Sequence, residues 1–310
     1  MRLDNERPSG NIEDRRGRGG FGFPRRGGMP GGGIRVPIGG RGGIGIGGIV
    51  ILLIVAFIFG INPLDMLDGG GVRIPGPGTT QSEAPGTGGS TKTTPGSDAT
   101  KDFVARVLGS TERVWTEQFR TMNRQYDPAG LVLFSDGVES ACGMAQSAVG
   151  PFYCPQDSKV YIDLSFLEDL DRALDSPGDF AQAYVIAHEV GHHIQNLLGT
   201  AEEVTRERLR VPEEEGNLLS VRMELQADCF AGVWARSADE TAGILESGDI
   251  EEGLNAASKI GDDRMQKRAQ GYVVPEAFTH GSSEQRQRWL KRGLETGKIT
   301  DCDTFATDDL

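Results

Sequence analysis

The pentapeptide His188-Glu189-Val190-Gly191-His192 constrains this chain more than any other stretch. Histidines four positions apart lie on one face of an α-helix, one turn apart, where both rings can hold the same Zn²⁺ ion. The Glu after the first His then faces the coordination position that water normally fills. Because the chain has only 4 His in 310 residues, chance is a poor explanation. The motif predicts a zinc-binding helix with Glu189 as general base.

The residues around the motif indicate a buried helix. The segment 180–187 before it is almost entirely apolar, and Ile194 and Leu197 follow it at helical spacing. Gly199 is typical of a helix C-terminus. A helix that is apolar round most of its circumference belongs in a core, where histidines need polar partners or a metal ion.

A catalytic zinc site needs a third protein ligand and one open position. Apart from the motif, the chain offers only His193, which points off the ligand face, and the distant His280. A carboxylate is therefore favoured, and we predict Glu224, which lies in a second apolar helical segment. Asp228, one turn further along, shares the face of Glu224 and is predicted to accept the free N–H of a ligating His. The simpler alternative is that both carboxylates are solvated on a helix surface.

These motifs resemble those of the bacterial neutral zinc metallopeptidases, a membrane-anchored family with the sequences H-E-x-G-H-H and E-L-Q-A-D-C. The matching segments are 188–193 and 224–229, the N-terminal segments 1–9 and 13–17, and the C-terminal segments 278–282 and 285–286. The resemblance covers nearly the whole chain. It implies a zincin-like, gluzincin-type peptidase whose third ligand is a Glu, and it names no substrate.

An apolar stretch indicates a membrane anchor. Residues 42–61 contain no charged side chain, and as a helix they span about 30 Å, one hydrocarbon core. Residues 1–41 hold nine Arg and four acidic residues, and the positive-inside rule then places the N-terminus in the cytoplasm. We therefore predict a single-pass protein of the cell membrane that contacts the lipid bilayer through residues 42–61, with its catalytic domain outside the cytoplasm.

Composition divides the rest of the chain into three parts. Residues 1–41 are rich in Gly and Arg and are predicted to be a disordered cytoplasmic tail. Residues 62–100 are rich in Gly, Pro and Thr and are predicted to be a flexible linker. Residues 101–310 are long enough for one domain. The chain has a net charge of −13, and because residues 1–41 contribute +5, the remainder carries −18. We therefore expect no nucleic-acid partner for the external domain.

The predicted domain is α+β, mostly helical with a small sheet. Short apolar runs at 131–134 and 160–164 indicate strands, and the second is a candidate for the sheet edge that pairs with an extended substrate. Apolar residues recur at helical spacing over 102–122, before the strands, and over 180–199, 221–237, 251–270 and 284–295, after them.

The four cysteines all fall within the predicted external domain. An even number outside the cytoplasm indicates two disulfides, whereas buried free thiols are the alternative. Of three possible pairings we favour Cys142 with Cys154 and Cys229 with Cys302. The first closes a short loop and the second ties the C-terminus to the helix of Glu224.

His280 has two interpretations. It precedes Ser282 and Gln285, which have the spacing of a helix capping box, so its role is either structural or catalytic. As a catalytic residue it would stabilise the oxyanion that forms when water attacks a carbonyl. Tyr161, Tyr184 and Tyr272 are alternatives for that role.

Together these features predict an enzyme, a membrane-anchored zinc metallopeptidase that hydrolyses peptide bonds of a protein or peptide substrate with a metal-activated water. Two other functions stay open. One is a catalytically silent zinc-containing interaction module of the cell envelope, with a fourth protein ligand on the metal. The other is a zinc amidase that acts on a non-peptide substrate.

Overall fold

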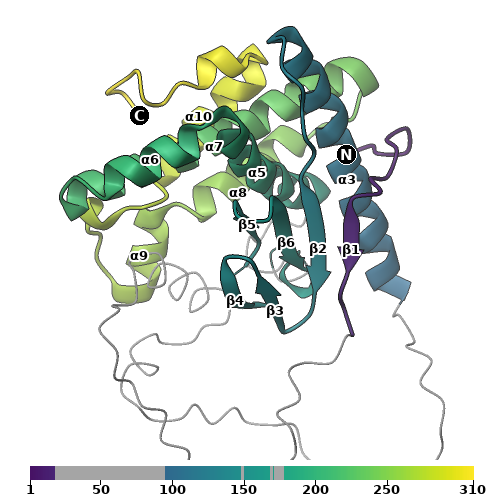
Figure 1. The fold of residues 1–310 in the computed structure, drawn as a ribbon, viewed down its shortest axis with the longest axis horizontal. Coiled ribbons are helices and arrows are strands. Elements are labelled where there is room, and N and C mark those ends of the chain that lie inside the picture. Colours follow the sequence, from purple (N-terminus) through teal and green to yellow (C-terminus); the bar gives the residue numbers. More distant parts are fainter. Residues whose placement is uncertain (18–94, 148–149, 168–169, 171–177) are drawn as a thin grey trace, which may run out of the picture.

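Two long helices cross at the centre of the domain and carry the predicted motifs. They are α5 (Asp179–Leu198) and α7 (Glu213–Ala242), and Figure 1 shows the other helices and a small sheet packed around them. The computed structural model describes residues 1–17, 95–147, 150–167, 170 and 178–310. The core contains the buried faces of α5 and α7 together with α3 (Pro95–Thr121) and one face of the sheet.

The sheet has four strands in the order β1-β2-β6-β5. The strands β1 (Ile12–Asp14), β2 (Gly130–Phe134) and β6 (Lys159–Asp163) are parallel, whereas β5 (Phe152–Cys154) runs antiparallel to β6. Leu131 and Leu133 of β2 face the main core, and Val132 and Phe134 face a smaller apolar cluster on the other side. Because both faces of β2 are covered, its sequence is continuously apolar rather than alternating.

A two-stranded hairpin and short helices complete the described part of the chain. The hairpin pairs β3 (Gly137–Ser140) with β4 (Gly143–Gln146). The remaining elements are α6 (Thr200–Arg208), α8 (Asp249–Lys259), α9 (Asp262–Gln270), α10 (Ser283–Thr296) and the 3₁₀ turns η2 (Pro275–Ala277) and η3 (Ile299–Cys302). The single helix predicted over 251–270 is therefore two helices, and the chain turns between them at Ile260 and Gly261.

The first residues of the chain belong to the folded domain. Leu3 and Glu6 are buried, and β1 adds a parallel strand to β2 with Ile12 opposite Leu131. The Met1 ammonium lies 2.6 Å from Asp179, the first residue of α5. The segment crosses α3 at Gly109, where an added Cβ would lie 2.0 Å from the Arg7 carbonyl oxygen. The prediction that the whole of 1–41 is disordered is therefore wrong for residues 1–17, because backbone pairing and burial hold this part against the domain.

The other predictions of architecture have mixed outcomes. The α+β class, mostly helical with a small sheet, is confirmed. Helix α3 begins at Pro95, inside the predicted linker 62–100. Strand β6 is not a sheet edge, because β2 and β5 flank it on both sides. Among the strands that the structure describes, β1 and β5 form the edges.

The predicted membrane helix at 42–61 lies outside the described residues. Within the described ranges, every helix is too short or too polar to cross a bilayer.

Candidate metal centre

The two motif histidines point toward the same carboxylate. On α5, His188 and His192 lie one turn apart with ring centroids 4.8 Å apart. The Nε2 atom of His188 is 3.1 Å from Glu224 Oε2, and that of His192 is 3.5 Å from Glu224 Oε1. Glu224 comes from α7, so the structure brings together the three side chains that the sequence proposed as ligands.

A glycine permits the close approach of the two helices. An added Cβ at Gly191 would lie 2.9 Å from the Ala227 carbonyl oxygen and 3.0 Å from Ala227 Cα. Only a residue without a side chain fits between the helices at this distance. Gly191 therefore sets the spacing that puts Glu224 opposite the histidines.

The donor atoms fit a zinc ion. One ligand atom from each of His188, His192 and Glu224 lies within 4.8 Å of the other two. Tetrahedral zinc with bonds of about 2.0–2.2 Å separates neighbouring ligand atoms by about 3.3–3.6 Å, close to the 3.1 and 3.5 Å seen here. Two imidazoles and one carboxylate are also the donor set of catalytic zinc sites, in which the fourth position takes water.

Each histidine has a different partner on its second ring nitrogen. His188 Nδ1 lies 2.8 Å from Asp228 Oδ1, the contact predicted for Asp228. His192 Nδ1 lies 2.8 Å from the Gln195 side-chain oxygen. Since both acceptors are oxygen atoms, Nδ1 carries the proton in each ring. Nε2 is then the ring nitrogen that would bind a metal ion after losing its own proton.

Asp228 belongs to a buried polar cluster. Its carboxylate is fully buried and receives the Tyr184 hydroxyl at 2.5 Å. Arg286 of α10 donates to both carboxylate oxygens, from Nε and an NH₂ group, each at 2.8 Å. This paired geometry satisfies a charge that would otherwise be costly to bury. Arg286 lies in a polar helix, and the sequence of such a helix does not show which of its arginines is buried.

Charge interactions shift the pKa values of the ligands. Burial alone would lower the pKa of His188, but the Asp228 and Glu224 carboxylates raise it to about 10. Burial also opposes charge on Glu224, yet the nearby His192 and His280 hold its pKa well below the usual value. The pKa of Asp228 falls to about 2 because Arg286 and His188 outweigh its burial. The centre thus keeps both carboxylates ionised, as ligation of a divalent cation requires.

Glu189 lies at the edge of the same centre. Its residue is 9% exposed, and its negative charge is one of the groups that raise the pKa of His192. The neighbouring His193 points elsewhere: its ring contacts the Tyr153 hydroxyl at 2.9 Å and the Asp127 carbonyl oxygen at 2.7 Å. His193 therefore anchors α5 to the sheet side of the domain.

His280 lies beside the cap of α10 and within electrostatic reach of Glu224. Its Nδ1 is 3.2 Å from Asp262 Oδ1, and Asp262 also accepts the backbone N–H groups of Thr279, His280 and Gly281. The capping box between Ser282 and Gln285 is present. The charge of Glu224 raises the pKa of His280 although burial lowers it. His280 is thus tied to the cap region and also faces the charge of the metal centre.

The three tyrosines considered as alternatives to His280 for stabilising the oxyanion either bond to other groups or lie on the surface. The Tyr184 hydroxyl is occupied by Asp228, and the Tyr161 hydroxyl donates to Asp157 at 2.7 Å. Tyr272 is 62% exposed on the loop after α9.

Both predicted disulfides are present. Cys142 pairs with Cys154 across the β3–β4 hairpin and β5, and Cys229 of α7 pairs with Cys302 of η3.

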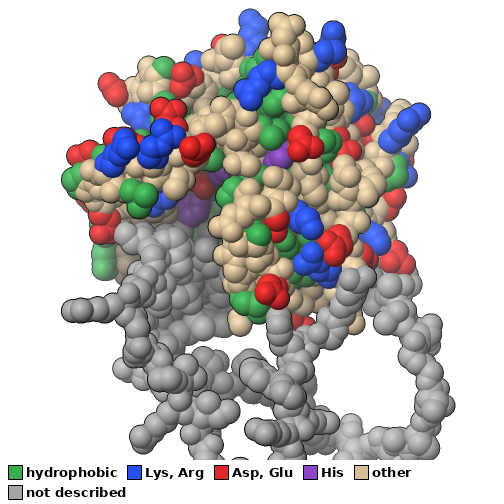
Figure 2. All heavy atoms as spheres, in the orientation of Figure 1, with side chains coloured by type: hydrophobic (Ala, Val, Ile, Leu, Met, Phe, Trp, Pro, Cys, Tyr) green, Lys and Arg blue, Asp and Glu red, His purple; other side chains and the backbone are tan. Residues whose placement is uncertain are grey.

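The histidines are reached from solvent through a hollow. Figure 2 shows histidine side chains at its floor, between α6 and the part of the molecule that carries the β3–β4 hairpin. His192 and Glu224 keep about a fifth of their side-chain surface exposed, at 20% and 19%. Water therefore has access to the centre.

A family model and several known proteins are similar in sequence to this chain. Residues 1–305 match the family described as "Putative neutral zinc metallopeptidase". The chain is 46% identical over 306 residues to "Uncharacterized protein YpfJ" of Escherichia coli K12, covering 98% of this chain and 99% of the relative. It is 42% identical over 228 residues to "Uncharacterized protein Rv2575" of Mycobacterium tuberculosis, covering 69% of this chain and 75% of the relative. No solved structure matched the chain.

The family match spans nearly the whole chain and implies a Zn²⁺ cofactor, for which the His188, His192 and Glu224 donors are suited. The chain belongs to the neutral zinc metallopeptidase family.

Proposed function

We propose that this protein is a zinc-dependent peptidase that hydrolyses peptide bonds in a protein or peptide substrate. The observation that carries the proposal is the convergence of His188, His192 and Glu224 beside Glu189, in a centre reached from solvent. His188, His192 and Glu224 would hold the ion. When bound, Zn²⁺ lowers the pKa of water and polarises the carbonyl of the scissile bond.

The residues of the chain would move the protons. Glu189 takes a proton from the attacking water and delivers it to the leaving amine, as a general base and then a general acid. Asp228, held by Arg286 and Tyr184, keeps the His188 ring in the orientation that directs Nε2 toward the ion. His280 is positioned by Asp262 and, when protonated, would stabilise negative charge that develops on the carbonyl oxygen.

We also propose that the domain works outside the cytoplasm, at a membrane surface. Two disulfides support an oxidising compartment, since such bonds are rare in the cytosol. The uncharged segment 42–61 supports contact with a bilayer.

The experiment compares the full-length protein with Glu189→Gln and with the control Glu203→Gln, which changes an exposed Glu of α6. Zinc content and cleavage of an unfolded protein are measured on the same samples. We expect stoichiometric zinc in all three, with cleavage reduced about 10²–10⁴-fold or more in Glu189→Gln alone. Zinc without cleavage in the wild type would refute peptidase activity, and undiminished cleavage by Glu189→Gln would refute the assignment of the base.

A further inference from the structure

The structure assigns to Gln195 and Gln226 the role of positioning residues, which orient His192 by connecting it to the disulfide-anchored C-terminal segment. This inference rests on the zinc site of the proposed function. It concerns His192, whose hydrogen-bond partner Gln195 is uncharged, whereas the partner of His188 is the charged Asp228.

The first link is the amide of Gln195. Gln195 is fully buried, and its side-chain nitrogen donates to the Met223 carbonyl oxygen at 2.6 Å and to the Gln226 side-chain oxygen at 3.2 Å. Both amide hydrogens are thus used on α7, which leaves the Gln195 oxygen facing His192 Nδ1 at 2.8 Å. The position of the amide nitrogen therefore selects the ring nitrogen of His192 that carries the proton.

The second link is the amide of Gln226. Its side-chain nitrogen donates to the Cys302 carbonyl oxygen at 3.1 Å, and its oxygen consequently faces Gln195. With the amide of Gln226 turned over, two NH₂ groups would face each other and a carbonyl would face a carbonyl. The Cys302 carbonyl therefore orients Gln226, and the Gln226 oxygen together with the Met223 carbonyl orients Gln195.

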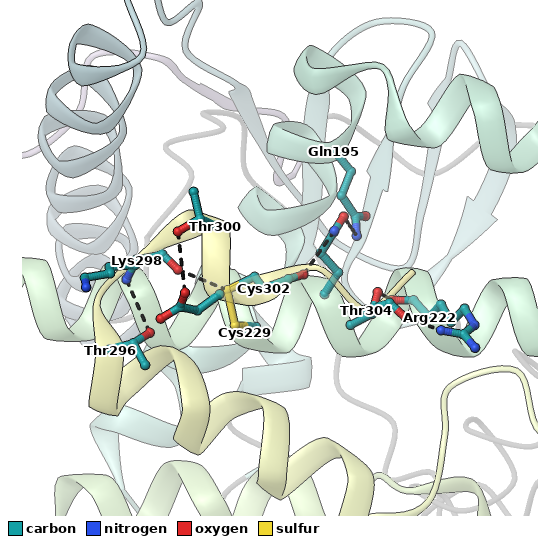
Figure 3. The surroundings of a disulfide bond; sticks show 10 residues. Gln195, Arg222, Cys229, Thr296, Lys298, Thr300, Cys302 and Thr304 are labelled. Atoms are coloured by element: carbon teal, nitrogen blue, oxygen red, sulfur yellow. Dashed lines mark hydrogen bonds between the residues drawn. A yellow bond between two sulfur atoms is a disulfide. The ribbon is translucent and has the colours of Figure 1, made fainter. Parts of the chain in front are cut away.

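The third link fixes Cys302 itself. The buried disulfide joins it to Cys229 of α7. Beyond the disulfide, the Thr304 hydroxyl donates to the Arg222 carbonyl oxygen at 2.7 Å, and the Arg222 guanidinium donates to the Thr304 and Thr307 carbonyl oxygens. Figure 3 shows Gln195, the disulfide and the Thr304–Arg222 contact along this stretch of α7. His192 on α5 is thereby connected to the C-terminal segment through Gln195, Gln226 and Cys302.

The test measures metal binding by the full-length protein, without reliance on turnover. Gln195→Leu removes the acceptor of His192, Gln226→Leu removes the support of Gln195, and Gln195→Glu keeps an acceptor oxygen. Gln266→Leu is the control. Gln266 is buried nearly as far as Gln226 (8% against 7% exposed), but its side chain accepts the Val274 backbone N–H and lies outside the Gln195–Gln226 chain of bonds. The readouts are zinc affinity by competition with a chelating dye, the visible spectrum of the Co²⁺-loaded protein, and stability in urea.

We expect Gln195→Leu to bind zinc 10–100-fold more weakly, the usual effect of removing the partner of a ligating His. Gln226→Leu should weaken binding in the same direction, and both Leu variants should change the Co²⁺ spectrum. Gln195→Glu keeps the acceptor for His192 but loses both donors to α7, so it should bind zinc more tightly than Gln195→Leu. Equal zinc affinity for the two Leu variants and the control would overturn the inference and leave the zinc site intact. A wild-type protein that binds no zinc would refute the proposed function itself.

A second inference follows independently from the N-terminal segment. Residues 1–17 belong to the same folded body as the described residues of 95–310: β1 pairs with β2, Arg2 donates its backbone N–H to the Ile244 carbonyl oxygen at 2.7 Å, and the buried Glu6 pairs with Arg113. A single membrane span at 42–61 would place these two parts in different compartments. Backbone pairing across a bilayer is impossible, so a single span and this fold exclude each other.

We propose that residues 1–17 lie on the same side of the membrane as residues 95–310. The test introduces one cysteine into the full-length protein in intact cells, either Asn5→Cys in the N-terminal segment or Glu203→Cys on α6, both at exposed positions. The native cysteines are paired and leave the new thiol as the labelling site.

A membrane-impermeant maleimide reports the side of each thiol. Equal labelling of both variants, whether before or only after lysis, supports the proposal, and the timing identifies the compartment. Labelling of Glu203→Cys in intact cells with Asn5→Cys protected until lysis would overturn it.

Discussion

Gly191→Ala tests whether the spacing of α5 and α7 builds the metal centre. The new Cβ would lie 2.9 Å from the Ala227 carbonyl oxygen, whereas ordinary contacts begin at 3.4 Å. The helices must therefore separate locally by about 0.5 Å, which exceeds the tolerance of about 0.2 Å on zinc–ligand distances. Glu224 would move away from the two histidines, which it now approaches at 3.1 and 3.5 Å.

Two quantities should change together in this variant. Overpacking costs about 1–3 kcal/mol of unfolding free energy, and zinc affinity should fall at least about tenfold, equivalent to about 1.4 kcal/mol. The control is Gly253→Ala, whose Cβ would meet the Phe180 ring at 2.6 Å in the contact between α8 and α5. Urea denaturation and dye competition are run on both proteins. If Gly191→Ala were destabilised yet bound zinc as tightly as Gly253→Ala, helix spacing would not control the site.

Three further predictions address the surroundings of the centre. Arg286→Met leaves the buried Asp228 carboxylate without its cation and should cost about 3–5 kcal/mol in urea denaturation, whereas Arg288→Met at an exposed pair should cost under about 1 kcal/mol; similar losses for the two would contradict a buried network. Burial lowers the pKa of His280, but the Glu224 and Asp262 carboxylates raise it by more. The stabilising contribution of His280 is therefore complete below about pH 6.5 and is lost as pH rises through the folded-state pKa. In metal-free protein, the loss of stability caused by His280→Asn should shrink between pH 5.5 and pH 9, and a constant loss would exclude the charge interaction. Deletion of residues 1–17 should lower the unfolding free energy by at least about 2 kcal/mol through loss of the buried Leu3 alone, and an unchanged denaturation midpoint would show that the segment is not part of the domain.

Much of the candidate site could be predicted because metal chemistry restricts the residues that can take part. Spacing alone put His188 and His192 on one helix face, and the shortage of other histidines left a carboxylate such as Glu224 as the third donor. The Gln195 and Arg286 contacts could not be predicted in this way. A buried amide or guanidinium has the same sequence signature as a solvated one, and its burial depends on how α7 and α10 pack.

The fold was predictable where apolar spacing is strong and not where pairing partners decide. Helices α3, α5, α7 and α10 follow their apolar positions, and the two disulfides follow from an even number of cysteines in one domain. Strand β1 has the sequence Ile-Glu-Asp in a Gly- and Arg-rich context, and its charges are matched locally, with Glu13 bonded to Arg15 and Asp14 to Arg16. Such a strand carries no apolar pattern, and only its partner β2 reveals it. The same holds for the position of β6 inside the sheet, because β5 is only 3 residues long.

Anomalous diffraction at the zinc edge, from crystals of the full-length protein grown with Zn²⁺, tests the central proposal most directly. The proposal predicts one strong peak bonded to the Nε2 atoms of His188 and His192 and to the Glu224 carboxylate, with a solvent oxygen as the fourth ligand. A peak at another group of residues, or a fourth ligand supplied by a protein side chain such as His280, would contradict a catalytic zinc centre.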